Sequence, residues 1–277
     1  MTIKKYAGGK FLATLAVALI VLSAQNIFAG ARIGLPSDVY YHRFASSVRG
    51  PEAAWINPAA LAIERDLYLQ YIGVYFEGDF TNDRGTIVTG DGVGIAYRRI
   101  EDYMGAKYSE YIFGGGIPVG NKTYCGASYR YIKNGFDYYN KRHFWNIGIL
   151  YEYNPRFAFG ATLSNLNRGE IRGEKSDMEQ LYSLSYKTYS DKIIISVEMT
   201  LSSKQSLSSA KYNYGIDFHI QPGLVIYANR NNDQFYQIGF TLNFGDYFAG
   251  SQSHIDSDNK HLGTSAYGGF IKELSGH

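Results

Sequence analysis

Two histidines lie near polar partners in this sequence, and they are the residues best suited to catalysis. His219 follows Asp217 by two residues on one face of an alternating segment, and His143 lies close to Asn146. A hydrolase or acyltransferase on a barrel face would pair such a histidine with a serine nucleophile. Neither histidine lies near a Gly-x-Ser-x-Gly turn or in another recognisable triad context. The sequence therefore favours a protein that is not an enzyme and that needs no cofactor.

The other reactive side chains give no stronger site. Cys125 is the only cysteine, so the chain has no intramolecular disulfide and no Cys-x-x-Cys motif. A metal could be held by His254, Asp256, Asp258 and His261, but a solvated loop explains this polar stretch better. We therefore assign no metal site.

Charged side chains on the polar faces of several alternating segments are the candidates for a lumen. They have both signs, and opposite charges in a narrow interior favour hydrogen-bonded ion pairs that brace it. The alternative is a polar track for a solute, which would require an open lumen. The positions are Arg98, Arg130, Glu152, Glu198, Asp217 and His219.

These charged positions belong to segments in which apolar and polar residues alternate. In residues 212–220, an aromatic or aliphatic residue occupies every second position, with Asn, Gly, Asp or His between them. The segments 145–153, 157–163 and 236–244 repeat this pattern. A period of two is that of a β-strand whose two faces differ chemically. Many such segments, each of about ten residues, predict an all-β protein.

The predicted fold is a transmembrane antiparallel β-barrel of about 12 to 14 strands with an N-terminal helical hatch or plug segment. The chain has 26 tyrosines and 31 glycines in 277 residues. Interfacial aromatic girdles and small lumen-facing residues explain this composition, and the outer wall would contact outer-membrane lipid. The alternative is a soluble β-sandwich, whose strands are usually shorter, about five or six residues.

Residues 1–31 have the pattern of a secretory signal peptide. Three lysines precede an apolar run over residues 11–22, and the small-residue segment Ala29-Gly30-Ala31 follows. That run is shorter than the about 20 residues that a spanning helix needs. Removing the three leader lysines from the 27 basic residues leaves 24, against 25 acidic residues. This near-neutral mature chain argues against a nucleic-acid partner, which would need a concentrated basic face.

The rest of the chain divides into three parts. The N-terminal hatch or plug segment covers residues 32–65, the barrel covers 66–245, and a polar loop and tail with one candidate closing strand at 265–272 covers 246–277.

Tight turns alternate with longer polar connections along the barrel sequence. The turns are centred on Asn121, Pro155, Asp191 and Pro222. Short turns of such barrels normally face the periplasm. Counting strands from Asp66, with the N-terminal segment in the periplasm, places these turns outside, so the polarity stays open.

The segment between leader and barrel lacks strand alternation and predicts two short helical turns. Gly50 precedes Pro51, and Asn57 precedes Pro58, so each proline has a tolerated cap residue before the first helical position. Within it, Ala54, Asn57, Pro58, Ala59 and Leu61 form an Ala-x-x-Asn-Pro-Ala-x-Leu pattern.

This pattern, placed after a leader and before strands, resembles the FadL-like and PorV/PorQ-like outer-membrane proteins of Gram-negative-type bacteria. The FadL resemblance implies a hatch that plugs the lumen and shifts when a hydrophobic small molecule binds. The PorV/PorQ resemblance implies instead a component of type IX secretion or surface attachment, with secretion-machinery proteins as partners. The residues that would form the hatch or contact the ligand are Trp55, Asn57, Pro58, Ala59 and Leu61.

The N-terminal segment has two further interpretations. It could be a gating hatch, or it could merely seal the barrel end without a ligand role. Trp55 separates them, because its loss should prevent folding if it is a core anchor and should spare folding if it is a ligand contact.

Overall fold

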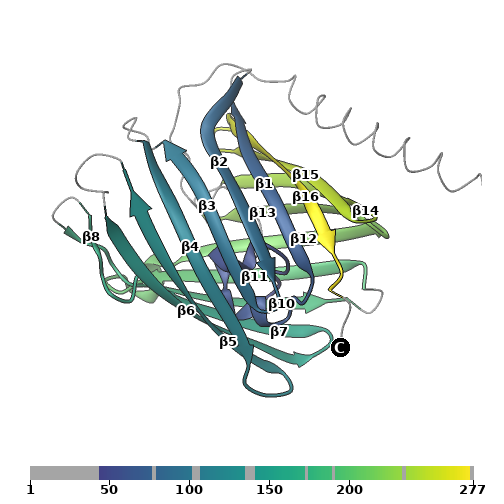
Figure 1. Ribbon diagram of the computed structural model, residues 1–277, viewed down its shortest axis with the longest axis horizontal. Coiled ribbons are helices and arrows are strands. Elements are labelled where there is room, and N and C mark those ends of the chain that lie inside the picture. Colours follow the sequence, from purple (N-terminus) through teal and green to yellow (C-terminus); the bar gives the residue numbers. More distant parts are fainter. Residues whose placement is uncertain are drawn as a thin grey trace, which may run out of the picture.

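The chain forms a closed antiparallel barrel of 14 strands (Figure 1). The computed structural model describes residues 44–76, 79–101, 107–134, 141–171, 174–188, 191–232 and 235–274. The predicted signal peptide and residues 32–43 of the predicted hatch segment lie outside these ranges. The expected all-β barrel is confirmed, with a strand number at the upper end of the expectation.

The barrel strands follow one another around the ring with neighbours along the chain paired. Their bounds are β1 Leu67–Phe76, β2 Asp79–Gly90, β3 Val93–Glu101, β4 Lys107–Pro118, β5 Thr123–Lys133, β6 Arg142–Asn154, β7 Phe157–Ser164, β10 Glu179–Lys187, β11 Ile193–Ser202, β12 Lys211–Gln221, β13 Leu224–Asn231, β14 Tyr236–Phe244, β15 Tyr247–Ile255 and β16 His261–Lys272. The connection from β7 to β10 contains a small hairpin of β8 Glu170–Ile171 and β9 Glu174–Lys175, and the 3-10 turn η3 Leu207–Ser209 lies between β11 and β12.

The sequence predicts a barrel that ends at residue 245. In the structure the barrel continues beyond it, because β15 and β16 supply its last two strands. β16 closes the ring by pairing with β1 from Leu67↔Lys272 to Tyr75↔Thr264. The candidate closing strand at 265–272 lies within β16. The sequence did not predict β15 because Ala249, Ser251 and Ser253 occupy the outward positions in its middle and leave no apolar alternation there.

Alternate side chains cover the outer wall with apolar surface. On β6, Trp145, Ile147, Ile149 and Tyr151 are 48, 41, 46 and 38 % exposed, whereas Leu150 between them is fully buried. The same division of faces recurs on the other strands with clear alternation. A broad exposed apolar wall on a closed barrel is what a lipid environment requires.

The short turns gather at one end of the barrel, which we call the turn end. It holds the connections 91–92, 119–122, 155–156, 188–192, 222–223 and 245–246, together with the start of β1 and the end of β16. The opposite end, the loop end, holds mostly longer connections. The strand count made from the sequence omits β2. With β2 included, the short turns lie at the same end of the barrel as the start of β1 and the end of β16. Their position therefore agrees with the usual rule for such barrels.

Two helical turns of the N-terminal segment lie inside the ring of strands (Figure 1, purple). They are α2 Ala53–Ile56 and the 3-10 turn η2 Pro58–Ala62. The second begins at the predicted proline, whereas the first begins two residues after Pro51. Over the described part of the chain, no helix has the length and apolar character to cross a membrane.

Candidate functional site

Residues 44–66, which we call the inner segment, lie against the lumen face of the barrel wall, and a row of this wall lacks side chains. Gly116, Gly126 and Gly148 are direct cross-strand partners on β4, β5 and β6 and form a row of glycines facing the lumen. A β-carbon on Gly126 would overlap the backbone of Pro58 and Ala59, and one on Gly148 would overlap the Asn57 side chain. The glycine row therefore lets backbone approach backbone, which side chains would prevent.

Asn57 fastens the inner segment to itself and to the wall. Its side-chain oxygen accepts a hydrogen bond from the Ala59 N–H at 3.1 Å and so caps η2. Its Nδ2 donates to the carbonyl oxygens of Ala45 and Ile149 at 2.9 and 3.1 Å. Asn57 is fully buried, so these bonds satisfy both the donor and the acceptor of its amide.

The residues after Asn57 lie against the wall. Pro58, Ala59 and Leu61 are all buried, with Leu61 next to the inward-facing Gly94 and Gly114. Leu61 and Ala59 also share an apolar cluster with Leu150 of β6. Pro58 starts η2, where the missing N–H of a proline costs nothing.

Trp55 lies between the inner segment and the charged part of the lumen. Its ring packs against Ile87, Ala96 and Ile112 of three neighbouring strands. The Arg98 guanidinium lies over the ring, 5.5 Å from the centroid. Such a contact combines apolar packing with cation–π attraction.

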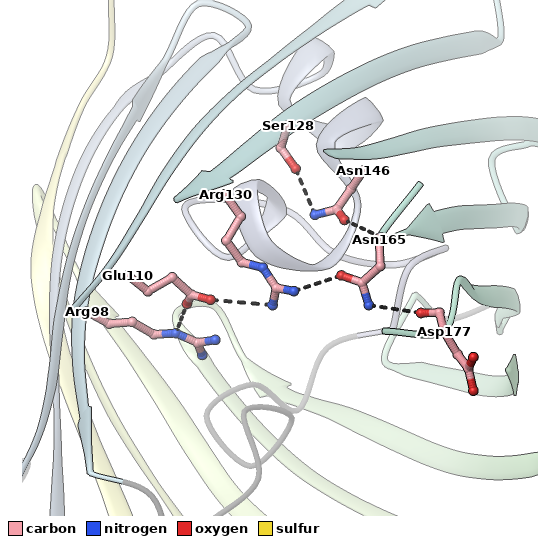
Figure 2. Close-up of polar contacts among 7 residues, drawn as sticks. All are labelled: Arg98, Glu110, Ser128, Arg130, Asn146, Asn165 and Asp177. Carbon is pink, nitrogen blue, oxygen red and sulfur yellow. Dashed lines mark hydrogen bonds and ion pairs between the residues drawn. The ribbon is translucent and has the colours of Figure 1, made fainter. Parts of the chain in front are cut away.

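Ion pairs link the three strands β3, β4 and β5, as Figure 2 shows for Arg98, Glu110 and Arg130. Glu110 of β4 accepts a hydrogen bond from Arg98 of β3 and forms an ion pair with Arg130 of β5 at 3.4 Å. Arg98 and Glu110 are buried, and the Arg130 guanidinium also stacks over Phe144, 4.5 Å from the ring centroid. Two cations thus share one carboxylate, an arrangement that braces the interior.

The network continues through amide side chains to the loop end (Figure 2). Arg130 donates to the Asn165 side chain at 2.8 Å, and Asn165 donates to the Asp177 carbonyl at 3.3 Å. Asn146 accepts from the Asn165 N–H and donates to Ser128. The Asp177 carboxylate accepts a hydrogen bond from Lys204, which lowers the pKa of that carboxyl.

Sequence reasoning missed Glu110, although a signal for it existed. The predicted alternation began at Tyr111, and continuing it one residue back places Glu110 on the inward face. Asn165 lies in a connection and has a positive φ of 59°, so no strand pattern could have identified it.

The predicted lumen acids Glu152 and Glu198 both hold the start of the inner segment. Arg49 donates to Glu152 at 2.6 Å, and Glu198 accepts from the Ala45 N–H at 3.1 Å. Ser46 lies between them, with its hydroxyl oxygen 2.7 Å from that of Ser183 and 2.6 Å from that of Ser185. Apolar contacts add to these polar bonds, because the buried Phe44 ring covers Gly215 of β12 and Val48 packs in a cluster with Leu150.

A cavity of about 430 Å³ opens at the turn end beside this attachment. Its wall includes Ser46 and Arg49 of the inner segment and Phe157, Ala158 and Ile194 of the barrel. Basic side chains at the turn end, Lys122, Arg156 and Lys187, also line it.

The remaining candidate residues lie on β6, β12 and β15 and in the turn after β15. Asp217 is buried, and both it and His219 lie on the inward face of β12. His143 faces outward on β6 and Asn146 faces inward, so they do not form a pair. His254 is buried and bonds to Ser265, whereas Asp256 accepts backbone N–H bonds in the following turn.

The fold is shared with channels and transporters of hydrocarbons. The chain is similar to the CymD monoaromatic hydrocarbon channel at a TM-score of 0.60 and 10 % identity, over 88 % of this chain and 98 % of that one. For the Pseudomonas putida toluene transporter TodX the TM-score is 0.56 at 9 % identity, over 88 % and 100 %. For the Ralstonia pickettii toluene transporter TbuX it is 0.54 at 10 % identity, over 81 % and 94 %. No protein-family model and no curated protein sequence matches the chain.

At these identities the likeness shows the barrel fold, and the three proteins are named as channels or transporters, not as enzymes. A PorV/PorQ-like role, the significance of the Asn-Pro-Ala pattern and the roles of the individual site residues stay predictions.

Proposed function

We propose that this protein passes hydrophobic small molecules across the outer membrane of a Gram-negative-type bacterium, with the inner segment as a movable hatch. The observation that carries the proposal is that a separate stretch of chain, not the wall itself, fills the lumen beside β3–β7. Similarity in fold to monoaromatic hydrocarbon channels supports hydrophobic compounds as the class of substrate.

The contacts of the inner segment suit repeated docking and release. Against Gly116 and Gly126 the contact is with the backbone of the inner segment, so no interlocking of side chains has to be undone there. At its start, Ser46 and Arg49 are held by hydrogen bonds and an ion pair that water can replace. Its other end continues directly into β1, so release of the start would let the segment pivot about residues 64–66.

A reversible lock tests this proposal. In a C125S background, S46C and S185C place two thiols where the hydroxyl oxygens are 2.6 Å apart, which suits a disulfide. With β1 holding the other end, oxidation would fix the inner segment at both ends. We expect toluene uptake into proteoliposomes to fall to the protein-free rate on oxidation and to recover on reduction.

A second disulfide within the wall is the matched control. S185C and S196C replace hydroxyls 2.7 Å apart on paired strands and leave the inner segment free. Oxidising this pair should leave uptake unchanged. Equal uptake by the oxidised and reduced S46C/S185C protein would contradict a moving hatch and leave the segment as a plug.

A further inference from the structure

Outward side chains near the loop end form three successive rows of different chemistry on β2–β6. The row nearest the barrel middle, which we call the apolar row, consists of Val88, Ile95, Phe113, Tyr129 and Trp145. The next row, which we call the aromatic row, consists of Thr86, Tyr97, Tyr111, Tyr131 and His143. The third row, which we call the cationic row, has Arg84, Arg99 and Lys133, with Ser109 between the last two.

The cationic row concentrates positive charge in a small area. Arg84 and Arg99 are direct cross-strand partners, and Lys133 lies two strands further along the same row. Neighbouring strands are about 4.8 Å apart, so the row spans about 15 Å. Like charges placed directly opposite each other destabilise a sheet. An anion bound between them would remove this repulsion.

Among the described residues, no ion pair neutralises the charge of the cationic row. In the next row outward, Lys107 has its own partner, Glu101, at 3.5 Å. On the opposite wall, Arg230 already lies over Tyr236, 5.1 Å from the ring centroid.

The aromatic row marks where acyl chains should end and head groups begin. Tyr97 and Tyr111 have ring centroids 5.3 Å apart, and those of Tyr111 and Tyr131 are 6.4 Å apart. Tyrosine concentrates at the membrane interface because its ring is apolar and its hydroxyl is polar. The cationic row is one strand repeat beyond it, about 7 Å further out. It therefore lies at the level of lipid head groups.

We propose that this wall binds a phosphorylated, multiply acylated glycolipid of the outer leaflet. The acyl chains would lie on the apolar and aromatic rows, and a phosphate would accept hydrogen bonds from the guanidinium groups of Arg84 and Arg99 and from Lys133. The proposal uses the usual orientation of such barrels, with the loop end outside. It does not involve the lumen and so is independent of hydrocarbon passage.

Binding of lipid A with and without its phosphates tests this site on the detergent-purified protein. Native mass spectrometry should show wild-type protein binding bisphosphorylated lipid A about ten-fold more tightly than the dephosphorylated form. The variant R84Q/R99Q/K133Q should lose this preference. The control K211Q/R230Q/K260Q removes three exposed cations between β12 and the β15–β16 turn at the same end and should keep it.

An unchanged preference in R84Q/R99Q/K133Q, or an equal loss in the control, would overturn the proposal. Complete displacement of lipid A by millimolar inorganic phosphate would also overturn it, because the site would then recognise an anion and not a lipid. If the triple variant does not fold, R99Q alone provides the same comparison, with an expected loss of about three-fold. Toluene uptake by the folded variants should equal that of wild type, so failure of this proposal is distinguishable from failure of the hatch.

Discussion

The lumen is filled in two different ways on its two sides. Beside β3–β7, inward glycines are covered by the backbone of the inner segment, as at Gly126 beneath Pro58. On β14 and β15, Gly239 is covered by the ring of Tyr227 and Gly250 by the ring of Tyr267. Those rings come from neighbouring wall strands, their hydroxyl groups are hydrogen-bonded to each other, and that of Tyr267 is also hydrogen-bonded to Thr241.

This difference separates a removable filling from a fixed one. Tyr227 and Tyr267 leave the lumen only if the barrel wall itself is disrupted. The inner segment is joined covalently to the wall at β1 and elsewhere is held by apolar packing and polar bonds. Changes on the tyrosine side should therefore lower barrel stability, whereas changes beneath the inner segment should release it from an intact barrel.

Tyr267→Ala should have the largest effect, and it should fall on the barrel. The ring is 8 % exposed and packs with Ile72, Val74 and Phe248. Loss of a buried aromatic ring costs about 3–5 kcal/mol. Urea unfolding in liposomes should show this loss, while protease cleavage within residues 44–66 stays at the wild-type rate. Faster cleavage with unchanged barrel stability would contradict the division into two sides.

Gly126→Val should release the inner segment, because a β-carbon there overlaps the backbone of Pro58. Such overpacking costs about 1–3 kcal/mol. We expect rapid proteolysis within residues 44–66 from a barrel that keeps its heat-dependent electrophoretic mobility. Gly115→Val is the control, since that glycine faces outward and its β-carbon would meet only the Gly92 oxygen, at 3.8 Å. Protection equal to wild type in Gly126→Val would show that the glycine row does not seat the segment.

Asn57→Ala should weaken docking by about 2 kcal/mol, since it removes a helix cap and two buried hydrogen bonds. Hydrogen exchange of the Ala59 and Ala60 amides should accelerate accordingly. Asn57→Ser retains a capping oxygen, so it should recover part of the protection. No acceleration in the alanine variant would exclude Asn57 as the fastening.

Arg49→Gln should have the smallest effect. The side chains of Arg49 and Glu152 are 33 and 34 % exposed, and pairs of this kind contribute about 0.2–1 kcal/mol. The start of the inner segment should become slightly more sensitive to protease at low salt. The difference from wild type should vanish at 1 M salt, where the Debye length is about 3 Å. A difference that persists at high salt would indicate that Arg49 acts through packing.

Periodicity predicted much of the wall but little of what connects its parts. Strands β12 and β14, and β6 from Trp145 onward, have large apolar residues on their outward positions, so alternation identifies them. β2 was missed because its half nearest the loop end is polar and charged, and β15 because the outward side chains in its middle are small. These strands are held in the barrel by pairing with their neighbours, and the residue pattern of one strand does not show which strands pair with it.

The inner segment shows a similar limit. Proline and asparagine placed η2 correctly, and inward parity identified Arg98, Arg130, Glu152 and Glu198. Glu110 meets Arg98 within the β3–β4 hairpin, whereas Arg49 and Ala45 are 103 and 153 residues from Glu152 and Glu198, so only the complete fold brings these two pairs together. The glycine row also depends on register, because Gly116, Gly126 and Gly148 align only after three strands have paired.

Hydrogen exchange with and without toluene tests most directly whether the inner segment is a hatch. The amides of residues 53–62 should exchange faster than those of β15, and toluene should accelerate exchange in that segment alone. A segment that exchanges as slowly as β15, and that does not respond to toluene, would contradict a movable hatch and establish a permanent plug.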